Sequence, residues 1–205
     1  MSKSLFYLMC LLFIGTLLSC KEDKKEEVVS QKVLNYQYNE GTTNLEWTAY
    51  KTSSKIPVAG GFNQIMVTSE SSSDAKQVIE SLVFTIQTSS VETNNEDRNG
   101  KIVKHFFETI NSPTIEGKIK ALEKDNSATI EVTMNGITVD VVGTYTLEGP
   151  MFNFESVVDV SLWNGIAGIT ALNEVCSELH VDKDGASKLW TEVKLSFSTK
   201  LKTIS

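Results

Sequence analysis

Arginine is almost missing from this chain of 205 residues, where Arg98 stands alone among 19 basic side chains and the rest are lysines. Aspartate and glutamate together number 26, so the formal net charge is -7. Such an excess of carboxylates repels phosphate backbones and anionic surfaces, which argues against binding to nucleic acid. We therefore expect no nucleic-acid partner.

Histidine is also scarce, with His105 and His180 in two different predicted helices. A zinc site needs three or four ligands. The candidate ligand set in this sequence is Cys176, His180 and Asp182. The simpler interpretation is that His180 caps the C-terminus of its helix as a cation. No nucleophile elbow, P-loop or dinucleotide motif occurs. We therefore expect that the protein is not an enzyme and that it binds neither a metal ion nor a cofactor.

Long apolar runs are limited to residues 5–18 at the N-terminus, behind Lys3. This run is shorter than the roughly 20 residues of a membrane span and has the pattern of a signal peptide. It ends at Leu17-Leu18-Ser19-Cys20, which resembles the lipobox of bacterial lipoproteins. That resemblance implies a signal peptide over residues 1–19 and acyl chains on Cys20 that hold the protein at a membrane. The alternative is a plain secreted protein with an incidental cysteine.

Residues 20–32 are charged and contain no aromatic side chain. A segment of this composition buries too little apolar area to offset its ordering entropy, so we expect a disordered tether. Its start, Lys21-Glu22-Asp23, resembles the export tag of surface lipoproteins of Bacteroidetes-type bacteria. We expect an outer-membrane lipoprotein, either on the periplasmic face or on the cell surface.

Cysteine is too rare for a disulfide framework. Cys10 leaves with the signal peptide and Cys20 is acylated, so Cys176 is the single thiol left in the mature protein. We expect Cys176 to be a small buried apolar side chain on a helical face, with a reactive thiol as the alternative. The remaining residues, 33–205, suit one domain with its own core, and the sequence does not indicate an oligomeric state.

Alternation of apolar and polar residues is the strongest pattern in the chain. It runs through residues 114–122, 128–134, 137–147 and 151–160, with Asn135-Gly136 between the second and third of these segments. An Asn-Gly pair favours positive φ at both central positions of a hairpin turn. Four such segments joined by short turns predict an antiparallel meander.

Further strands are predicted at residues 45–50, 58–68, 82–88 and 193–201, with a bulge or sharp bend at Gly60-Gly61. Residues 96–107 and 167–179 are predicted to be helices that pack on the strands as lids or plugs, with Ile169, Leu172, Cys176 and Leu179 on one stripe. About eight strands close into a barrel without exposed edges. The predicted fold class is mostly β: a lipocalin-like antiparallel β-barrel with two short helices.

The faces of these strands that we expect to point inward carry almost no charge. An eight-stranded barrel either fills its interior with side chains or holds one small ligand. If a cavity remains, it suits a long hydrocarbon chain, since each buried methylene contributes about 0.8 kcal/mol. The predicted pocket residues are Phe84, Ile86, Ile130, Val132, Met134, Val139, Val141, Tyr145, Phe152, Phe154, Leu195 and Phe197. The alternative is a structural or interaction lipoprotein of the cell envelope with a filled core.

A series of short motifs in a fixed order resembles the YceI-like family of extracytoplasmic lipid- and polyisoprenoid-binding proteins. The motifs are Trp47-x-Ala49-x-Lys51, Gly60-Gly61-Phe62-Asn63-x-Ile65, Leu82-Val83-Phe84-x-Ile86, Ser90-Val91-x-Thr93, Asp97-Arg98, Phe106-Phe107, Ile115-x-Gly117, Met134-Asn135-Gly136, Leu162-Trp163, Leu172-Asn173 and Asp184-Gly185 through Ser187 to Trp190. They extend over residues 45–202. The resemblance implies a lipocalin-like barrel with a long internal hydrophobic pocket, and a membrane-anchored protein that binds or carries a polyisoprenoid or other lipid.

Arg98 is the one candidate for a polar contact with such a ligand. An isolated arginine in a lysine-rich chain suggests a planar, bidentate contact, either with a headgroup at the barrel mouth or in a salt bridge with Glu96, Asp97 or an opposing strand. Many members of the family have an acid and a histidine after this arginine, where this chain has Asn99 and Gly100. The chain therefore lacks, at these two positions, the groups for a role that depends on that acid or histidine.

Overall fold

The computed structural model describes residues 34–204, so the predicted signal peptide, Cys20 and the tether of residues 20–32 lie outside the described residues. Ten strands form one antiparallel sheet in the order β4-β5-β7-β8-β9-β10-β11-β2-β3-β6, and β1 pairs with β12. The strands are β1 (Asn35–Gln37), β2 (Asn44–Lys51), β3 (Ile56–Phe62), β4 (Ile65–Thr68), β5 (Val83–Gln87), β6 (Val91–Glu92), β7 (Thr114–Leu122), β8 (Ser127–Met134), β9 (Ile137–Glu148), β10 (Met151–Asp159), β11 (Leu189–Lys200) and β12 (Lys202–Ile204).

The curled sheet brings its two ends together, because β3 and β4 follow each other in the chain but lie near opposite ends of the strand order. β3 pairs with β2 and β4 pairs with β5, and Asn63 and Gln64 alone separate them. The Asn63 N–H donates to the Ser90 carbonyl at 2.9 Å, and the Gln87 N–H donates to the Gln64 carbonyl at 3.0 Å. With β3 and β4 counted as one strand and the short β6 set aside, the wall consists of β2, β3–β4, β5 and β7–β11. These are the eight predicted strands, and the mostly β fold class is confirmed.

The predicted meander is present as β7 to β10, with boundaries within one residue of those expected. Asn135 and Gly136 connect β8 to β9 with φ values of 52° and 67°. Positive φ at both positions is the geometry that this pair favours in a two-residue hairpin turn. The turn fixes the register of β8 against β9, in which Met134 pairs with Ile137.

Of the bulge or bend predicted at Gly60-Gly61, no bulge is present, and β3 changes its pairing partner between these two residues. Gly60 pairs in regular register with Trp47 as the last pair between β3 and β2, and Gly61 and Phe62 pair with β6 instead. Gly60 instead allows the Trp47 ring to pack closely against β3, because a Cβ on Gly60 would lie 2.5 Å from Cζ2 of Trp47. The register shifts of the sheet fall in β7 between Ile119 and Ala121, and in β11 between Leu189 and Val193.

Both predicted helices are present at one end of the barrel. The first is α2 (Glu96–Ile102), which continues as a π-helix, η3 (Val103–Phe107). The second is α3 (Ile166–Val175), followed by the 3₁₀ turn η5 (Ser177–Leu179). None of the helices within residues 34–204 is long and apolar enough to cross a membrane. The predicted apolar stripe is wrong at Leu179, which is exposed, because the α-helix ends at Val175 and the tighter turn changes the direction of later side chains.

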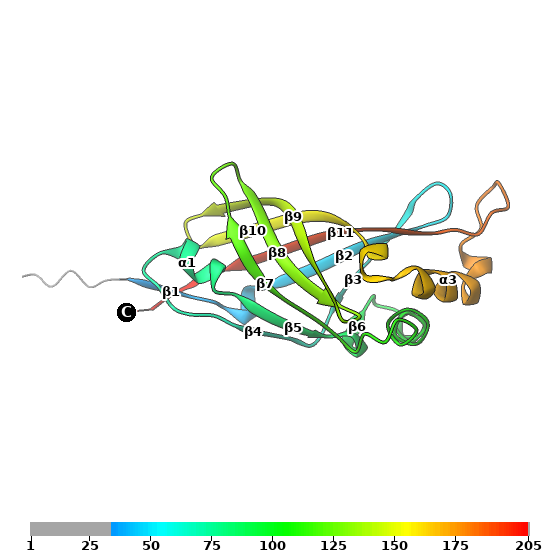
Figure 1. Cartoon of the computed structure of the whole chain (residues 1–205), viewed down its shortest axis with the longest axis horizontal. Helices are drawn as coiled ribbons and strands as arrows, with labels where there is room; N and C mark the ends of the chain where they lie inside the picture. The colour runs from blue at the N-terminus through cyan, green and yellow to red at the C-terminus, as the bar shows by residue number, and fades with distance from the viewer. Residues whose placement is uncertain (1–33, 205) are drawn as a thin grey trace, which may run out of the picture. The chain divides into compact units, whose positions relative to one another are not determined.

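A third short helix, α1 (Ala75–Glu80), was not predicted and closes the opposite end of the barrel (Figure 1). Its N-cap is Asp74, whose carboxylate accepts the Lys76 N–H at 2.9 Å. Val78 and Ile79 are fully buried in the core. The 3₁₀ segments η1 (Glu40–Thr42), η2 (Thr88–Ser90) and η4 (Val160–Trp163) complete the elements. The barrel therefore has a plugged end, beside β1 and β12, and an end covered by α3.

Candidate functional site

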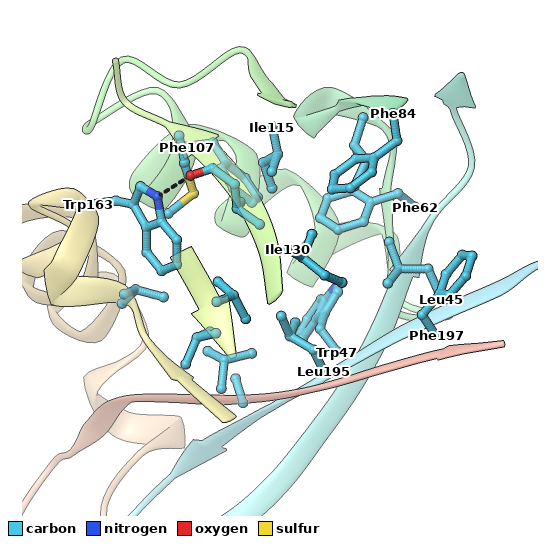
Figure 2. A pocket seen from close by; sticks show the side chains of 18 of the residues that line it. Leu45, Trp47, Phe62, Phe84, Phe107, Ile115, Ile130, Trp163, Leu195 and Phe197 are labelled. Carbon is cyan, nitrogen blue, oxygen red and sulfur yellow. Dashed lines mark hydrogen bonds between the residues drawn. The ribbon is translucent and has the colours of Figure 1, made fainter. Parts of the chain in front are cut away.

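A cavity of about 250 Å³ lies inside the barrel (Figure 2). Side chains from β2, β3, β4, β5, β7, β8, β9, β10 and β11 form its wall, and α2, η3, η4, α3 and Leu82, which precedes β5, contribute the rest. Every residue that lines it is alanine, valine, leucine, isoleucine, methionine, phenylalanine or tryptophan. Such a space can hold a hydrocarbon chain and offers no group that could replace the hydration of a charge.

The three tryptophans that line the cavity keep their polar atoms out of it. The indole N–H groups donate to backbone carbonyls: Trp47 to Gly61 at 3.3 Å, Trp163 to Val132 at 3.1 Å and Trp190 to Thr52 at 2.8 Å. Figure 2 shows the Trp163 bond as a dashed line. Their ring carbons remain available for contact with an apolar ligand, so the tryptophans add area without adding polarity.

Nine of the twelve predicted pocket residues line this cavity. They are Phe84, Ile86, Ile130, Val132, Met134, Val141, Phe154, Leu195 and Phe197. The alternation along β5, β8, β9, β10 and β11 thus separates the inner face from the outer face, as it must when side chains of a strand point to opposite sides in turn. Their contact with a ligand stays a prediction.

The other three predicted pocket residues do not line the cavity. Phe152 is fully buried, and its ring stacks on Tyr145 with 5.9 Å between the centroids. The Tyr145 hydroxyl donates to the Glu123 carbonyl at 2.9 Å, and Val139 packs against the core. These side chains point inward where the barrel is filled. Alternation predicts the inner face but does not indicate how far along a strand the interior stays open.

Some cavity residues were not among those predicted, although the sequence contains a signal for several of them. Leu45, Trp47 and Ala49 alternate along β2, and Ile169 and Leu172 lie on the predicted stripe of α3. The remaining cavity residues are Leu82, which precedes β5, and residues of β3, β4, β7, β10, β11, α2, η3 and η4. A contact between a helix and the open end of a barrel depends on tertiary packing, so no local pattern indicates it.

A second, more polar pocket of about 140 Å³ adjoins the cavity between β2, β3, α2 and α3. We call it the mouth pocket; the two spaces share Trp47, Ala49, Ile102, Leu172 and Leu189. Its charged lining consists of Lys51, Asp97, Arg98 and Lys101. Three cations and one carboxylate at this place contrast with the net negative charge of the chain. The mouth pocket can therefore attract an anionic or strongly polar group next to an apolar tail.

Arg98 lines the mouth pocket, and the predicted salt bridge to a neighbouring acid is wrong. Asp97 pairs with Lys101 instead, at 2.7 Å, because side chains four residues apart meet on a helix surface. Within residues 34–204 the guanidinium of Arg98 has no ion pair, and the backbone N–H of Arg98 donates to the helix-capping Asn95 at 2.9 Å. The guanidinium is thus available to a ligand.

Asn99, which departs from the family pattern, has a structural contact that suits an amide. Its Oδ1 accepts hydrogen bonds from the N–H and the hydroxyl of Thr93, at 2.9 and 2.7 Å. Its Nδ2 donates to the Glu92 carboxylate at 3.1 Å, and this bond is the main reason why the pKa of Glu92 lies below its usual value. A carboxylate at position 99 would repel Glu92 instead of donating to it.

Cys176 and His180 also line the mouth pocket. Cys176 is buried, which confirms the predicted burial of this side chain. No group of three or more His, Cys, Asp or Glu residues within residues 34–204 could hold a metal ion, so the imagined zinc site has no support. His180 is the C-cap residue of η5, as predicted, but the expected cationic state is disfavoured. The imidazole is buried, its Nδ1 lies 2.8 Å from Oδ1 of Asn173, and burial, followed by the nearby charge of Lys51, lowers its pKa.

The lowered pKa of His180 predicts a stability that falls in weak acid. An unfolded chain protonates this histidine near its ordinary value of 6.5, whereas the folded protein resists protonation until a lower pH. The free energy of unfolding should therefore decrease as the pH falls below about 6.5. Urea unfolding between pH 7 and pH 5 measures this slope, and His180→Gln should flatten it. An equal slope in both proteins would contradict the assignment.

Solved structures with a similar fold include proteins from three bacteria. A polyisoprenoid-binding domain from Saccharophagus degradans has 13% identity and a TM-score of 0.57, over 84% of this chain and 99% of its own. Burkholderia cenocepacia BcnA has 17% identity and a TM-score of 0.54, over 82% of this chain and 100% of its own. The Campylobacter jejuni YCEI protein has 16% identity and a TM-score of 0.52, over 72% of this chain and 85% of its own.

The family model described as the YceI-like domain matches residues 36–201. No curated protein matches the chain. The likeness to solved structures concerns the fold, whereas the family match covers nearly all of the described residues, including the cavity and the mouth pocket. The chain belongs to the YceI-like domain family.

Proposed function

We propose that this protein is a membrane-anchored, extracytoplasmic binding protein for a long apolar ligand, a polyisoprenoid or another lipid. The observation that carries the proposal is the cavity of about 250 Å³ with a wall made only of apolar side chains. Water in such a space would lack hydrogen-bond partners, whereas each methylene of a ligand gains about 0.8 kcal/mol on burial. A structurally similar domain from Saccharophagus degradans is described as polyisoprenoid-binding, which supports the same ligand class here.

Anchoring and location follow from the N-terminal sequence. A lipidated Cys20 after a signal peptide of residues 1–19 would hold the domain at the outer membrane, on the periplasmic face or at the cell surface. A tether over residues 20–32 would let the barrel move near that membrane. The alternative of an envelope lipoprotein with a filled core loses support because the interior contains the cavity.

Ligand analysis of the purified protein tests this function directly. The protein is purified without detergent, extracted with organic solvent and the extract is analysed by mass spectrometry. We expect a hydrophobic molecule with a long hydrocarbon chain, in a ratio approaching one per protein. Recovery of no such molecule, together with failure of the delipidated protein to take up an added polyprenol or fatty alcohol, would refute the proposal.

Arg98 should add affinity only for ligands with an anionic headgroup. A hydrogen bond to a charged group contributes about 1.5–3 kcal/mol, so Arg98→Gln should weaken binding of a polyprenyl phosphate by about 10- to 100-fold. Binding of the uncharged polyprenol should not change. Lys104→Gln removes an exposed charge that lines neither pocket and serves as the control. Equal losses for the phosphate and the alcohol would show that Arg98 acts on the fold and not on a headgroup.

A further inference from the structure

Aromatic rings on the cavity wall lie directly against glycines of neighbouring strands. Trp47 faces Gly60 across β2 and β3, and Phe84 faces Gly117 across β5 and β7. A Cβ built on Gly60 would lie 2.5 Å from the Trp47 ring, and one on Gly117 would overlap Cζ of Phe84. Carbon atoms in ordinary contact are about 3.5–4.0 Å apart. Each ring thus occupies the space that a side chain on the glycine would need.

The same arrangement occurs at two other places in the wall. A Cβ on Gly143 in β9 would lie 2.6 Å from the ring of Phe154 in β10. A Cβ on Gly168 in α3 would lie 2.6 Å from the ring of Phe106 in η3. All four rings line the cavity. The repetition on different elements indicates that the rings are kept against the wall along the cavity, with the centre left open.

We propose that these aromatic–glycine contacts set the width of the cavity and thereby let it accept methyl-branched chains, with Phe84 and Gly117 as a specificity-determining pair. The proposal rests on the proposed binding of an apolar chain and names what decides which chain fits. A polyisoprenoid carries methyl branches along its length and needs a wider passage than an unbranched acyl chain. A ring that lies on a glycine takes up less of that passage than a ring displaced by a neighbouring side chain.

The direction of displacement follows from the position of the ring. The methyl group of Gly117→Ala would have to regain ordinary contact with the Phe84 ring, which requires a shift on the order of 1 Å. The backbone of the wall lies on one side of the ring and the cavity on the other, so the ring must move into the cavity. Loss of room for a single methyl in an apolar pocket changes affinity by about 10- to 200-fold.

The test compares a branched and an unbranched ligand in the same full-length protein. Dissociation constants for geranylgeraniol and hexadecan-1-ol are measured by displacement of a fluorescent fatty acid. We expect Gly117→Ala to raise the ratio of the branched to the unbranched dissociation constant by at least about 10-fold. Phe84→Trp should raise the same ratio, because it enlarges the ring without changing the glycine. Phe152→Leu alters a buried aromatic side chain outside the cavity and should leave the ratio unchanged.

Stability and selectivity are separated by this choice of variants. A Cβ on Gly117 would also lie 2.5 Å from the Glu131 carbonyl oxygen, so Gly117→Ala costs stability by a route that does not involve the cavity. If that variant does not fold, the ratio for Phe84→Trp decides. A wild-type protein that binds both alcohols, with the same ratio in the folded variants, overturns the width proposal alone. A wild-type protein that binds neither alcohol overturns the proposed function and this inference with it.

Discussion

Ile130→Trp is expected to abolish binding of a long apolar ligand while the protein stays folded. Ile130 projects from β8 into the cavity, among the labelled side chains of Figure 2. An indole ring at this position would occupy the space of several methylenes of the ligand. Exclusion of four methylenes costs about 3 kcal/mol of binding free energy, which weakens affinity by more than about 100-fold. The new ring fills existing space, so we expect no loss of stability.

Displacement of a fluorescent fatty acid measures the effect, and thermal unfolding checks the fold. Val142→Trp is the matched control, because it places the same side chain on the outer face of the adjacent strand β9, where Val142 is 62% exposed. The control should bind ligand as the wild type does. Full affinity in a folded Ile130→Trp protein would mean that the ligand binds elsewhere, for example at the mouth pocket.

Cys20→Ser is expected to remove all lipid modification from the protein. The acyl chains that we propose for Cys20 require its thiol, and several chains together hold a protein stably at a membrane, whereas a single chain does so only marginally. Metabolic labelling with an alkyne fatty acid should mark the wild-type protein and leave the variant unmarked. Fractionation of the cells should show that the variant no longer accumulates in the outer membrane.

The other two cysteines are matched controls for this experiment. Cys10 lies within the predicted signal peptide, and Cys176 is buried in the folded domain. Cys10→Ser and Cys176→Ser should both keep the label. Incorporation of the fatty acid into Cys20→Ser would contradict the lipobox assignment and leave the plain secreted protein as the better description of the N-terminus.

The wall of the barrel was predictable because its signals are local. Inner and outer faces differ in solvent contact, so apolar and polar residues alternate along each strand. The turn between β8 and β9 was predictable from Asn135 and Gly136, whose positive φ values that turn requires. The helix α1 escaped prediction because its six residues are too few to show a helical period, and burial of Val78 and Ile79 under the barrel end stabilises it.

The candidate site was predictable only in part. Phe84 and Phe152 follow the same alternation, yet Phe84 lines the cavity and Phe152 belongs to the filled core. His180 illustrates the same limit. Its position after a helix suggests a cation, but burial against Asn173 lowers its pKa.

The amino-acid sequence by itself determined the strands, their faces, the meander and the family to which the chain belongs, since periodicity and turn residues act between near neighbours. Tertiary structure alone decided where the interior stays empty. A cavity exists where side chains from strands and helices that are distant in the chain fail to meet. The glycines opposite Trp47 and Phe84 contribute to that space, and their role becomes visible only when the strands are paired.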